Sequence, residues 1–141
     1  MIVYKGVSHP AMSDIMEHMT TRHYIAMFDD GSYHFLYEAF GWTGETAKSK
    51  DTGWADVRHV VEYQAEVAAG DLLEITAQLV KVGNKSITVV YSMHNRSRAE
   101  LAATLESTSV YFDLLARVAI PIAESMKTAA SGHLVSRQSI N

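Results

Sequence analysis

One segment of the chain, between residues 14 and 41, has apolar positions spaced with the period of a helix. At about 3.6 residues per turn, its small and apolar residues fall on one stripe, formed by Tyr24, Phe28, Gly31, Phe35 and Ala39. The opposite side carries Arg22, Asp29, Tyr33 and Tyr37. Thr20 or Thr21 can cap the start, because a hydroxyl accepts a hydrogen bond from a free N–H of the first turn. Gly41 can end the helix in a left-handed conformation.

From Trp54 onward the hydrophobic period changes to two, which is typical of strands with one wet face. The pattern predicts a long strand running to Val67, a second strand from Leu73, a two-residue hairpin loop at Gly83-Asn84, and further strands over residues 86–93 and 99–114. Residues 2–7 predict a short first strand, residues 42–53 a polar loop, and residues 120–129 a short helix. Strands that follow one helix favour the α+β class, with an antiparallel sheet packed on that helix.

Composition and charge narrow the class of protein. The chain has 141 residues, 48% hydrophobic and 20% charged, which fits one ordinary soluble domain over residues 1–141 with a frayed tail from about residue 131. The net charge is −4 without a run of Lys or Arg, so nucleic acid and membrane are not expected partners. Without cysteine there is no disulfide and no thiolate chemistry. No signal peptide or spanning segment is visible, and a cytoplasmic location is expected.

The polar residues Asp14, Glu17 and His18 precede the predicted helix directly. A helix N-terminus carries free N–H groups and partial positive charge, so it attracts a carboxylate or a developing oxyanion. His9, His18 and His23 lie close by in sequence, but their spacing matches no helical ligand pair at i, i+4, which argues against a metal site.

The run Asp14-Ile15-Met16-Glu17-His18-Met19-Thr20, followed by Tyr24 and Phe28, resembles a family motif. It is similar to the Asp-x-x-Gly-His-(Val/Met)-Asn motif of the hot-dog-fold acyl-CoA thioesterases of the 4-hydroxybenzoyl-CoA thioesterase type. Glu17 replaces the family's glycine and Thr20 its asparagine. The resemblance implies an antiparallel sheet of five or six strands wrapped around one long helix. It also implies a homodimer or homotetramer with sites at the subunit interface, an acyl-CoA substrate and no cofactor.

The resemblance also implies roles for individual residues. Asp14 corresponds to the catalytic carboxylate, acting as nucleophile or general base. The backbone N–H of Thr21 would hold the thioester oxygen. His18 would shape the site, although a packed histidine is an equal alternative. Glu17 is either a second acid–base group or a surface carboxylate, and we rank the surface interpretation first.

Further substrate-binding candidates are Thr20 and Tyr24 at the helix start and Trp54 and His59 on the first long strand. Trp54 could form a wall of an acyl pocket. Arg58, Arg96 and Arg98 could reach phosphates of CoA, but solvated arginines are the simpler interpretation.

The sequence therefore predicts an acyl-CoA thioesterase that releases a free acid and CoA, and it leaves the acyl group open. One alternative is a hot-dog-fold hydratase or dehydratase that uses Asp14 and His18. The other is a non-catalytic acyl-CoA-binding dimer in which Glu17 has abolished activity. Thioester hydrolysis across an acyl-CoA panel would separate the three hypotheses.

Overall fold

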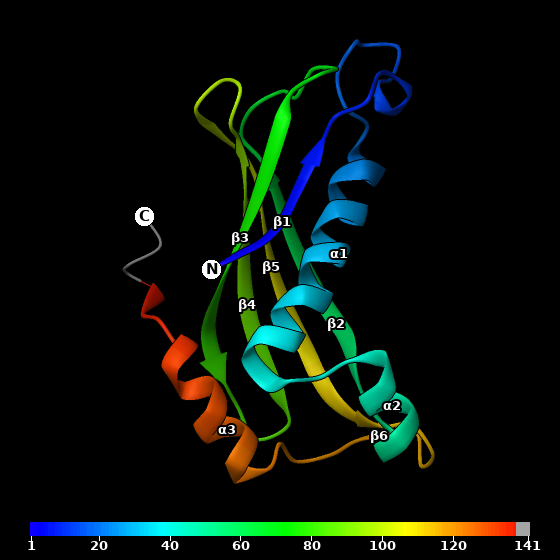
Figure 1. Cartoon of the computed structure of the whole chain (residues 1–141), viewed down its shortest axis with the longest axis vertical. Coiled ribbons are helices and arrows are strands. Elements are labelled where there is room, and N and C mark those ends of the chain that lie inside the picture. Colours follow the sequence, from blue (N-terminus) through cyan, green and yellow to red (C-terminus); the bar gives the residue numbers. More distant parts are fainter. Residues whose placement is uncertain (138–141) are drawn as a thin grey trace. The chain divides into compact units, whose positions relative to one another are not determined.

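The predicted helix is present in the computed structural model, which describes residues 1–137. Helix α1 spans Thr21–Phe40 (Figure 1). All five residues of the predicted stripe are buried; Tyr24 is 4% exposed and Phe35 0%. Gly41 has a φ of 66° and donates its N–H to the Tyr37 carbonyl at 2.8 Å, so the predicted left-handed C-terminus is confirmed.

Six strands form one sheet, as the period-two segments predict. Their bounds are β1 Ile2–Val7, β2 Thr52–Tyr63, β3 Leu72–Val82, β4 Ser86–Asn95, β5 Glu100–Asp113 and β6 Val118–Ala119. The strand order is β1-β3-β4-β5-β2, with β6 paired to β5, and the pairs β1–β3 and β5–β6 are antiparallel. The predicted fold class, an antiparallel sheet of five or six strands with one long helix packed on it, is confirmed.

The described chain forms two compact units, and each has its own part of the core. Unit 1 comprises Met1–His34, Val61–Ala77 and Tyr91–Leu105. In it, Phe28 of α1 packs near Tyr91 of β4, with ring centroids 6.5 Å apart. A Cβ added to Gly31 would lie 3.1 Å from Val3 of β1, so the absence of a side chain allows this close approach of helix and strand.

Unit 2 comprises Phe35–Val60, Gln78–Val90 and the chain from Glu106 onward. Its core is aromatic at the end of α1. The Trp54 ring lies between those of Phe40 and Tyr111, with centroid distances of 4.9 and 5.1 Å. Phe40 also meets Phe35 edge to face at 6.4 Å.

Two predicted loops differ in the structure. Residues 42–53 were expected to form a polar loop, but Gly44–Lys50 form helix α2 and the next residues begin β2. A capping box starts α2, because Thr46 N–H donates to Thr43 Oγ1 at 3.3 Å and Thr43 N–H donates to Thr46 Oγ1 at 3.2 Å. The loop at Gly83-Asn84 is one residue longer than predicted, since β3 ends at Val82 and β4 begins at Ser86.

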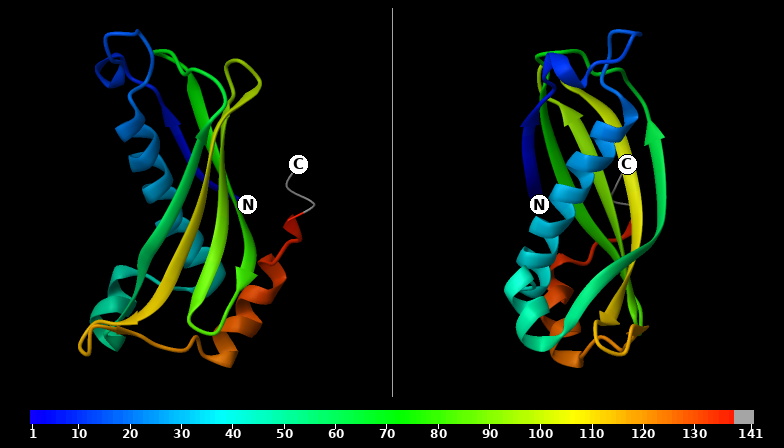
Figure 2. Two further views of the ribbon diagram at one scale, coloured as in Figure 1. Left: turned by 180° about the vertical axis from the view of Figure 1, so that it is seen from behind. Right: turned by 90° about the vertical axis from the view of Figure 1, so that its right-hand side faces the viewer.

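The first residues of the tail that was expected to fray, from about residue 131, are placed against the sheet in the structure. Helix α3 spans Glu124–Ala130, and the 3-10 turn η2 (Ser131–His133) follows it. Leu134 then forms a parallel bridge with Leu79 of β3, and Val135 N–H donates to the Leu79 carbonyl at 2.8 Å. Figure 2 shows this C-terminal segment beside the end of β3. Residues 138–141 lie outside the described residues.

Across residues 1–137, no helix has both the length and the apolar character that crossing a membrane requires.

Candidate active site

Backbone hydrogen bonds within the loop before α1 hold it in a tight turn. Asp14 N–H donates to the His18 carbonyl at 3.0 Å, and Glu17 N–H donates to the Asp14 carbonyl at 3.0 Å. The Asp14 carboxylate is held as well, because its Oδ1 accepts the Met16 N–H at 2.9 Å. These bonds place the predicted catalytic carboxylate on a tight, hydrogen-bonded turn.

Glu17 occupies the left-handed region of this turn, with a φ of 67°. Glycine adopts that conformation without the steric cost that a Cβ brings. This explains why a glycine suits the position in the motif that the sequence resembles. The Glu17 side chain is exposed and is not among the residues that line the pocket described below.

Three hydrogen bonds attach the loop to its surroundings just before the helix begins. Met19 N–H donates to the Val67 carbonyl at 2.7 Å, while the N–H and the hydroxyl of Thr20 both donate to the Met12 carbonyl, at 3.0 and 3.2 Å. Thr21 is the first residue of α1, so its own N–H lies outside the intrahelical ladder. The 20-residue helix places its positive dipole end at this N–H.

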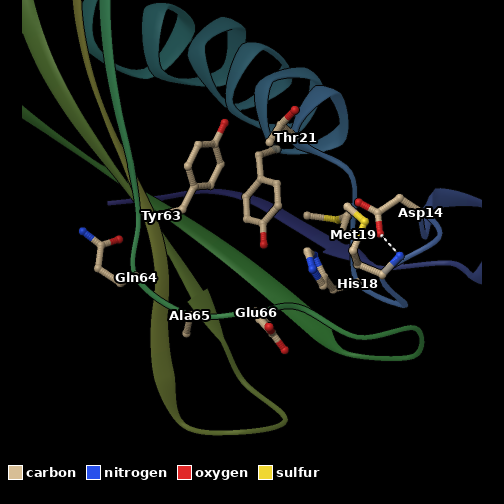
Figure 3. A pocket seen from close by; sticks show the side chains of 10 residues that line it. Asp14, His18, Met19, Thr21, Tyr63, Gln64, Ala65 and Glu66 are labelled. Carbon is tan, nitrogen blue, oxygen red and sulfur yellow. Dashed lines mark hydrogen bonds between the residues drawn. The ribbon is translucent and has the colours of Figure 1, made fainter.

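A pocket of about 320 Å³ opens at the start of α1, within unit 1 (Figure 3). Residues of the loop, the first helical turn and the chain around the end of β2 line it: Asp14, Met16, His18, Met19, Thr21, Tyr24, Tyr63, Gln64, Ala65 and Glu66. Four of the predicted site residues, Asp14, His18, Thr21 and Tyr24, therefore lie around one cavity. Thr20 is not among the lining residues, because its hydroxyl is turned to Met12.

The sequence did not predict the second wall of this pocket. The pattern extended the first long strand to Val67, whereas β2 ends at Tyr63. Beyond it the N–H groups of Gln64 and Ala65 both donate to the Ala102 carbonyl, at 2.8 and 3.1 Å. Two successive donors on one acceptor interrupt the strand ladder, and they bring residues 63–66 to the pocket. A period-two pattern contains no signal for such a break.

Two tyrosines meet in this pocket. The rings of Tyr24 and Tyr63 have centroids 5.0 Å apart and planes inclined by 84°. Burial raises the pKa of the Tyr24 hydroxyl above its ordinary value, and the nearby Tyr63 and Glu66 raise it further. A hydrogen bond with the backbone of Val67 lowers the pKa of Tyr24 by a smaller amount. The phenol of Tyr24 is therefore neutral over the physiological range.

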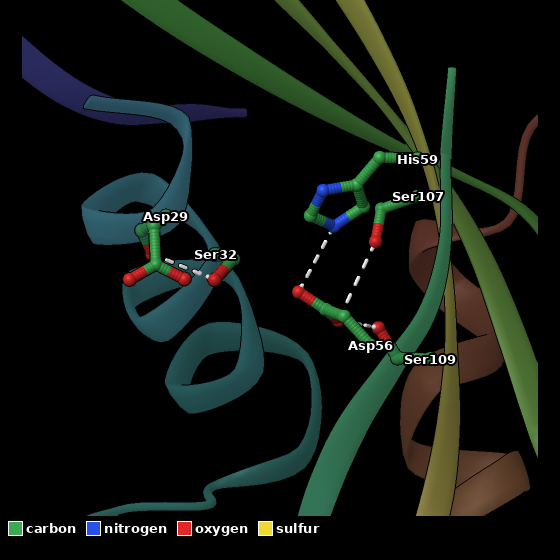
Figure 4. A network of polar contacts seen from close by, with 6 residues as sticks. All are labelled: Asp29, Ser32, Asp56, His59, Ser107 and Ser109. Atoms are coloured by element: carbon green, nitrogen blue, oxygen red, sulfur yellow. Dashed lines mark hydrogen bonds and ion pairs between the residues drawn. The ribbon is translucent and has the colours of Figure 1, made fainter. Parts of the chain in front are cut away.

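The other predicted substrate-binding residues, Trp54 and His59, belong to unit 2 and do not line this pocket. His59 Nε2 lies 3.1 Å from Asp56 Oδ2 on the same strand (Figure 4). The other oxygen of Asp56 accepts hydrogen bonds from the hydroxyls of Ser107 and Ser109 on β5. His59 is thus part of a polar network between β2 and β5, and Trp54 is part of the aromatic core of its unit.

The arginines that were considered for phosphate binding are engaged with acidic side chains. Arg58 lies 3.7 Å from Glu106, Arg96 lies 3.7 Å from Glu74, and the Nε of Arg98 lies 3.3 Å from Asp71. Within residues 1–137, no three histidine, aspartate or glutamate side chains gather as a metal site would require.

Comparison with known proteins identifies the family. The family model of the thioesterase-like superfamily matches residues 9–130. The chain belongs to this superfamily. A search of curated proteins gave no match to this thioesterase-like protein.

Solved structures with the same fold are similar to this thioesterase-like protein over nearly its whole length. A hypothetical protein from Staphylococcus aureus in complex with CoA has a TM-score of 0.85 at 16% identity, covering 100% of this chain and 93% of that chain. A gentisyl-coenzyme A thioesterase has a TM-score of 0.77 at 18% identity, covering 90% of this chain and 98% of that chain. A 1,4-dihydroxy-2-naphthoyl-CoA thioesterase from Synechocystis has a TM-score of 0.76 at 17% identity, covering 91% of this chain and 93% of that chain. The predicted hot-dog fold and the resemblance to its thioesterases are confirmed.

Proposed function

We propose that this protein is an acyl-CoA thioesterase that hydrolyses a thioester to a free acid and CoA. The observation that carries the proposal is that the Asp14 carboxylate and the first residue of α1 line the same pocket. A carboxylate beside a helix N-terminus supplies both groups that thioester hydrolysis needs, a base or nucleophile and an oxyanion donor. The gentisyl-CoA and naphthoyl-CoA thioesterases with this fold support the choice of substrate class.

In the proposed reaction the Asp14 carboxylate acts on the thioester carbonyl in one of two ways. As general base it takes a proton from a water molecule whose oxygen attacks the carbonyl carbon. As nucleophile it forms an anhydride that water then opens. In both cases the carbon–sulfur bond breaks, and the CoA sulfur leaves and is protonated. Among residues 1–137, Asp14 Oδ2 has no hydrogen-bond partner, which leaves this oxygen available for either role.

The negative charge that develops on the carbonyl oxygen needs donors that are in place before the reaction. The N–H of Thr21, with the dipole of α1 behind it, is the donor we propose. His18 lines the pocket beside Asp14 and would shape the site. The reaction needs no cofactor, since CoA is part of the substrate.

We also propose that the protein works as a homodimer or homotetramer. Strand β2 lies at an edge of the sheet and exposes apolar side chains, with Val57 60%, Val60 37% and Tyr63 48% exposed. A long apolar edge strand offers unpaired backbone groups to another copy. Tyr63 lines the pocket at the end of the same strand, so a second copy on β2 would lie next to the site.

The substitution Asp14→Asn tests the proposed reaction. The amide oxygen can still accept the Met16 N–H, so the loop should keep its conformation, but the amide cannot attack or take a proton at neutral pH. We expect kcat for thiol release to fall by about a hundredfold or more on the best substrate of an acyl-CoA panel. The melting temperature and oligomeric state should not change. Glu17→Gln is the matched control, since it removes an exposed carboxylate of the same loop.

A near-normal kcat for Asp14→Asn would place the base elsewhere. Formation of a hydrated acyl-CoA without thiol release would favour the hydratase alternative. Binding of acyl-CoA without any turnover by the wild-type protein would favour the non-catalytic dimer.

A further inference from the structure

The lining of the pocket at the start of α1 contains a second carboxylate and a pair of tyrosines that the hydrolysis of a thioester does not require. We infer that this pocket selects an acyl group that carries a positive charge, such as a quaternary ammonium, over neutral and anionic acyl groups of the same size. The inference rests on the proposed thioesterase function and names its substrate class. Two features of the lining carry it, its charge and its aromatic wall.

The charged side chains of the pocket are almost all of one sign. Asp14 and Glu66 contribute carboxylates from its two walls, and none of the ten described lining residues is lysine or arginine. His18 is the one lining side chain that can become cationic. A cavity with two carboxylates and without a fixed cation attracts a positive group and repels a negative one.

The aromatic wall adds a recognition element that is specific for cations. Tyr24 and Tyr63 meet edge to face, with planes inclined by 84° and centroids 5.0 Å apart, and Tyr63 is 48% exposed whereas Tyr24 is buried, so the Tyr63 ring is the one that can offer a face to a ligand. Ring faces are negative and attract an ammonium group placed over them, and quaternary ammonium ligands are bound in this way by aromatic cages. The thioethers of Met16 and Met19 add apolar, polarizable groups to the lining of the pocket.

The Glu66 carboxylate lies near the tyrosine pair in the same part of the pocket. Tyr24 and Tyr63 touch, and Glu66 follows Tyr63 by three residues on the segment that bends toward Ala102. Burial raises the pKa of Tyr24 most and Tyr63 raises it next, and the charge of Glu66 is near enough to raise this pKa as well. A cation over the Tyr63 ring would therefore lie near the Glu66 carboxylate as well. Figure 3 shows Tyr63 and Glu66 on one wall and Asp14 on the other.

The size of the pocket also favours a short acyl group. About 320 Å³ is at the lower end of the range for small-molecule sites. A short acyl chain with a compact cationic head would place its thioester near Asp14 and Thr21 and its head near Tyr63 and Glu66. A long fatty acyl chain would extend beyond the lining and make no use of the two carboxylates.

The test compares substrates of different charge, of which the first two have the same size and shape. The first is γ-trimethylammoniobutanoyl-CoA. The second is its carbon isostere, in which a tert-butyl group replaces the trimethylammonium group. The third is glutaryl-CoA, whose acyl group ends in a carboxylate. We expect kcat/KM for the cationic substrate to exceed that for the isostere by about tenfold, with glutaryl-CoA the poorest. Equal rates for the cationic substrate and the isostere would overturn the inference.

Two variants connect the preference to the lining. Glu66→Gln and Tyr63→Leu should each lower the ratio of kcat/KM between the cationic substrate and the isostere by about fivefold. Glu62→Gln is the matched control, because Glu62 is an exposed glutamate of β2 that does not line the pocket, and it should leave the ratio unchanged. A ratio that is the same in all three variants as in the wild type would overturn the assignment to this pocket.

Binding of thioether analogues separates this inference from the proposed hydrolysis. In these analogues a methylene group replaces the thioester carbonyl, so their dissociation constants do not depend on turnover. Tighter binding of the cationic analogue together with no hydrolysis of any substrate would support the charge preference and contradict the thioesterase function. Hydrolysis of all three substrates together with equal binding of the cationic and tert-butyl analogues would support the function and overturn the charge preference.

Discussion

At the scale of the residue, the backbone conformation of Glu17 determines the effect of having glutamate rather than glycine at this position. The resemblance places a glycine at this position, and the structure places it in a turn that needs a positive φ. Because the Glu17 side chain is exposed and the pocket is lined by its neighbours, the change affects the energy of the turn and leaves the lining intact. The interpretation of Glu17 as a surface carboxylate agrees with this geometry.

Glu17→Gly should therefore stabilise the protein. A left-handed residue with a Cβ is strained by about 1–2 kcal/mol, which glycine relieves. Part of this gain is offset, because glycine also makes the unfolded chain more flexible. We expect a net increase of about 1 kcal/mol in the free energy of unfolding, measured by urea denaturation. Ile15→Gly, at an exposed position of the same turn without a positive φ, should lower stability. A loss of stability in both variants would contradict this account.

The candidate site could be predicted only where its residues are neighbours in sequence. Asp14, His18, Thr21 and Tyr24 belong to one run of the chain, and the motif in that run connects them. Tyr63 and Glu66 reach the same pocket through a break in β2, and a break formed by shared hydrogen bonds to Ala102 leaves no pattern in the sequence. Trp54 and His59 were placed in the site because, in the fold that the sequence resembles, their strand runs past the partner's helix start. Within the described chain their contacts belong to unit 2, and their role in substrate binding stays a prediction.

At the scale of the element, the start of α1 combines structure and proposed catalysis in a single N–H group. Proline is tolerated as the first residue of a helix, because its missing N–H has no partner within the helix and its fixed φ suits that position. Thr21 occupies this position. The proposed oxyanion donor can therefore be removed without removing the helix.

Thr21→Pro should reduce kcat by about a hundredfold, the usual cost of losing one oxyanion donor. Thr21→Ala keeps the N–H and loses only the side chain, so it should stay within a few-fold of the wild type. Circular dichroism should show the same helical content for both variants. Equal activity of the proline and alanine variants would assign the oxyanion donor to another group.

Periodicity predicted the long elements and gave no sign of the short helix α2. Helix α1 and the strands β3, β4 and β5 follow from apolar repeats because their buried faces extend over many residues. Helix α2 depends instead on the reciprocal hydrogen bonds of Thr43 and Thr46 and has no buried residue. Such local hydrogen bonds stabilise a short helix without producing an apolar stripe.

At the scale of the whole molecule, the exposed edge strand β2 leads to a prediction about assembly. Val57→Lys places a charge in the middle of this strand, where two copies related by a two-fold axis would bring like charges together. We expect the wild-type protein to sediment as a dimer or tetramer at micromolar concentration, and the variant to shift toward the monomer. Leu115→Lys changes an exposed apolar residue of a turn and should not alter the assembly. A stable wild-type monomer would contradict the proposed assembly.

The bridge between Leu134 and Leu79 has a consequence for aggregation. The N-terminal residues pair with β3 only as far as Ala77, which exchanges backbone hydrogen bonds with Met1, and Leu134 and Val135 cover the backbone of β3 farther along, at Leu79. A bare strand edge at this place would be a template for strands of other chains, and short covering segments are one way in which proteins prevent such growth. We therefore expect the last described residues to hinder edge-to-edge association of β3 with strands of other chains. A shortened chain that ends at α3 would be expected to precipitate while its pocket stays intact.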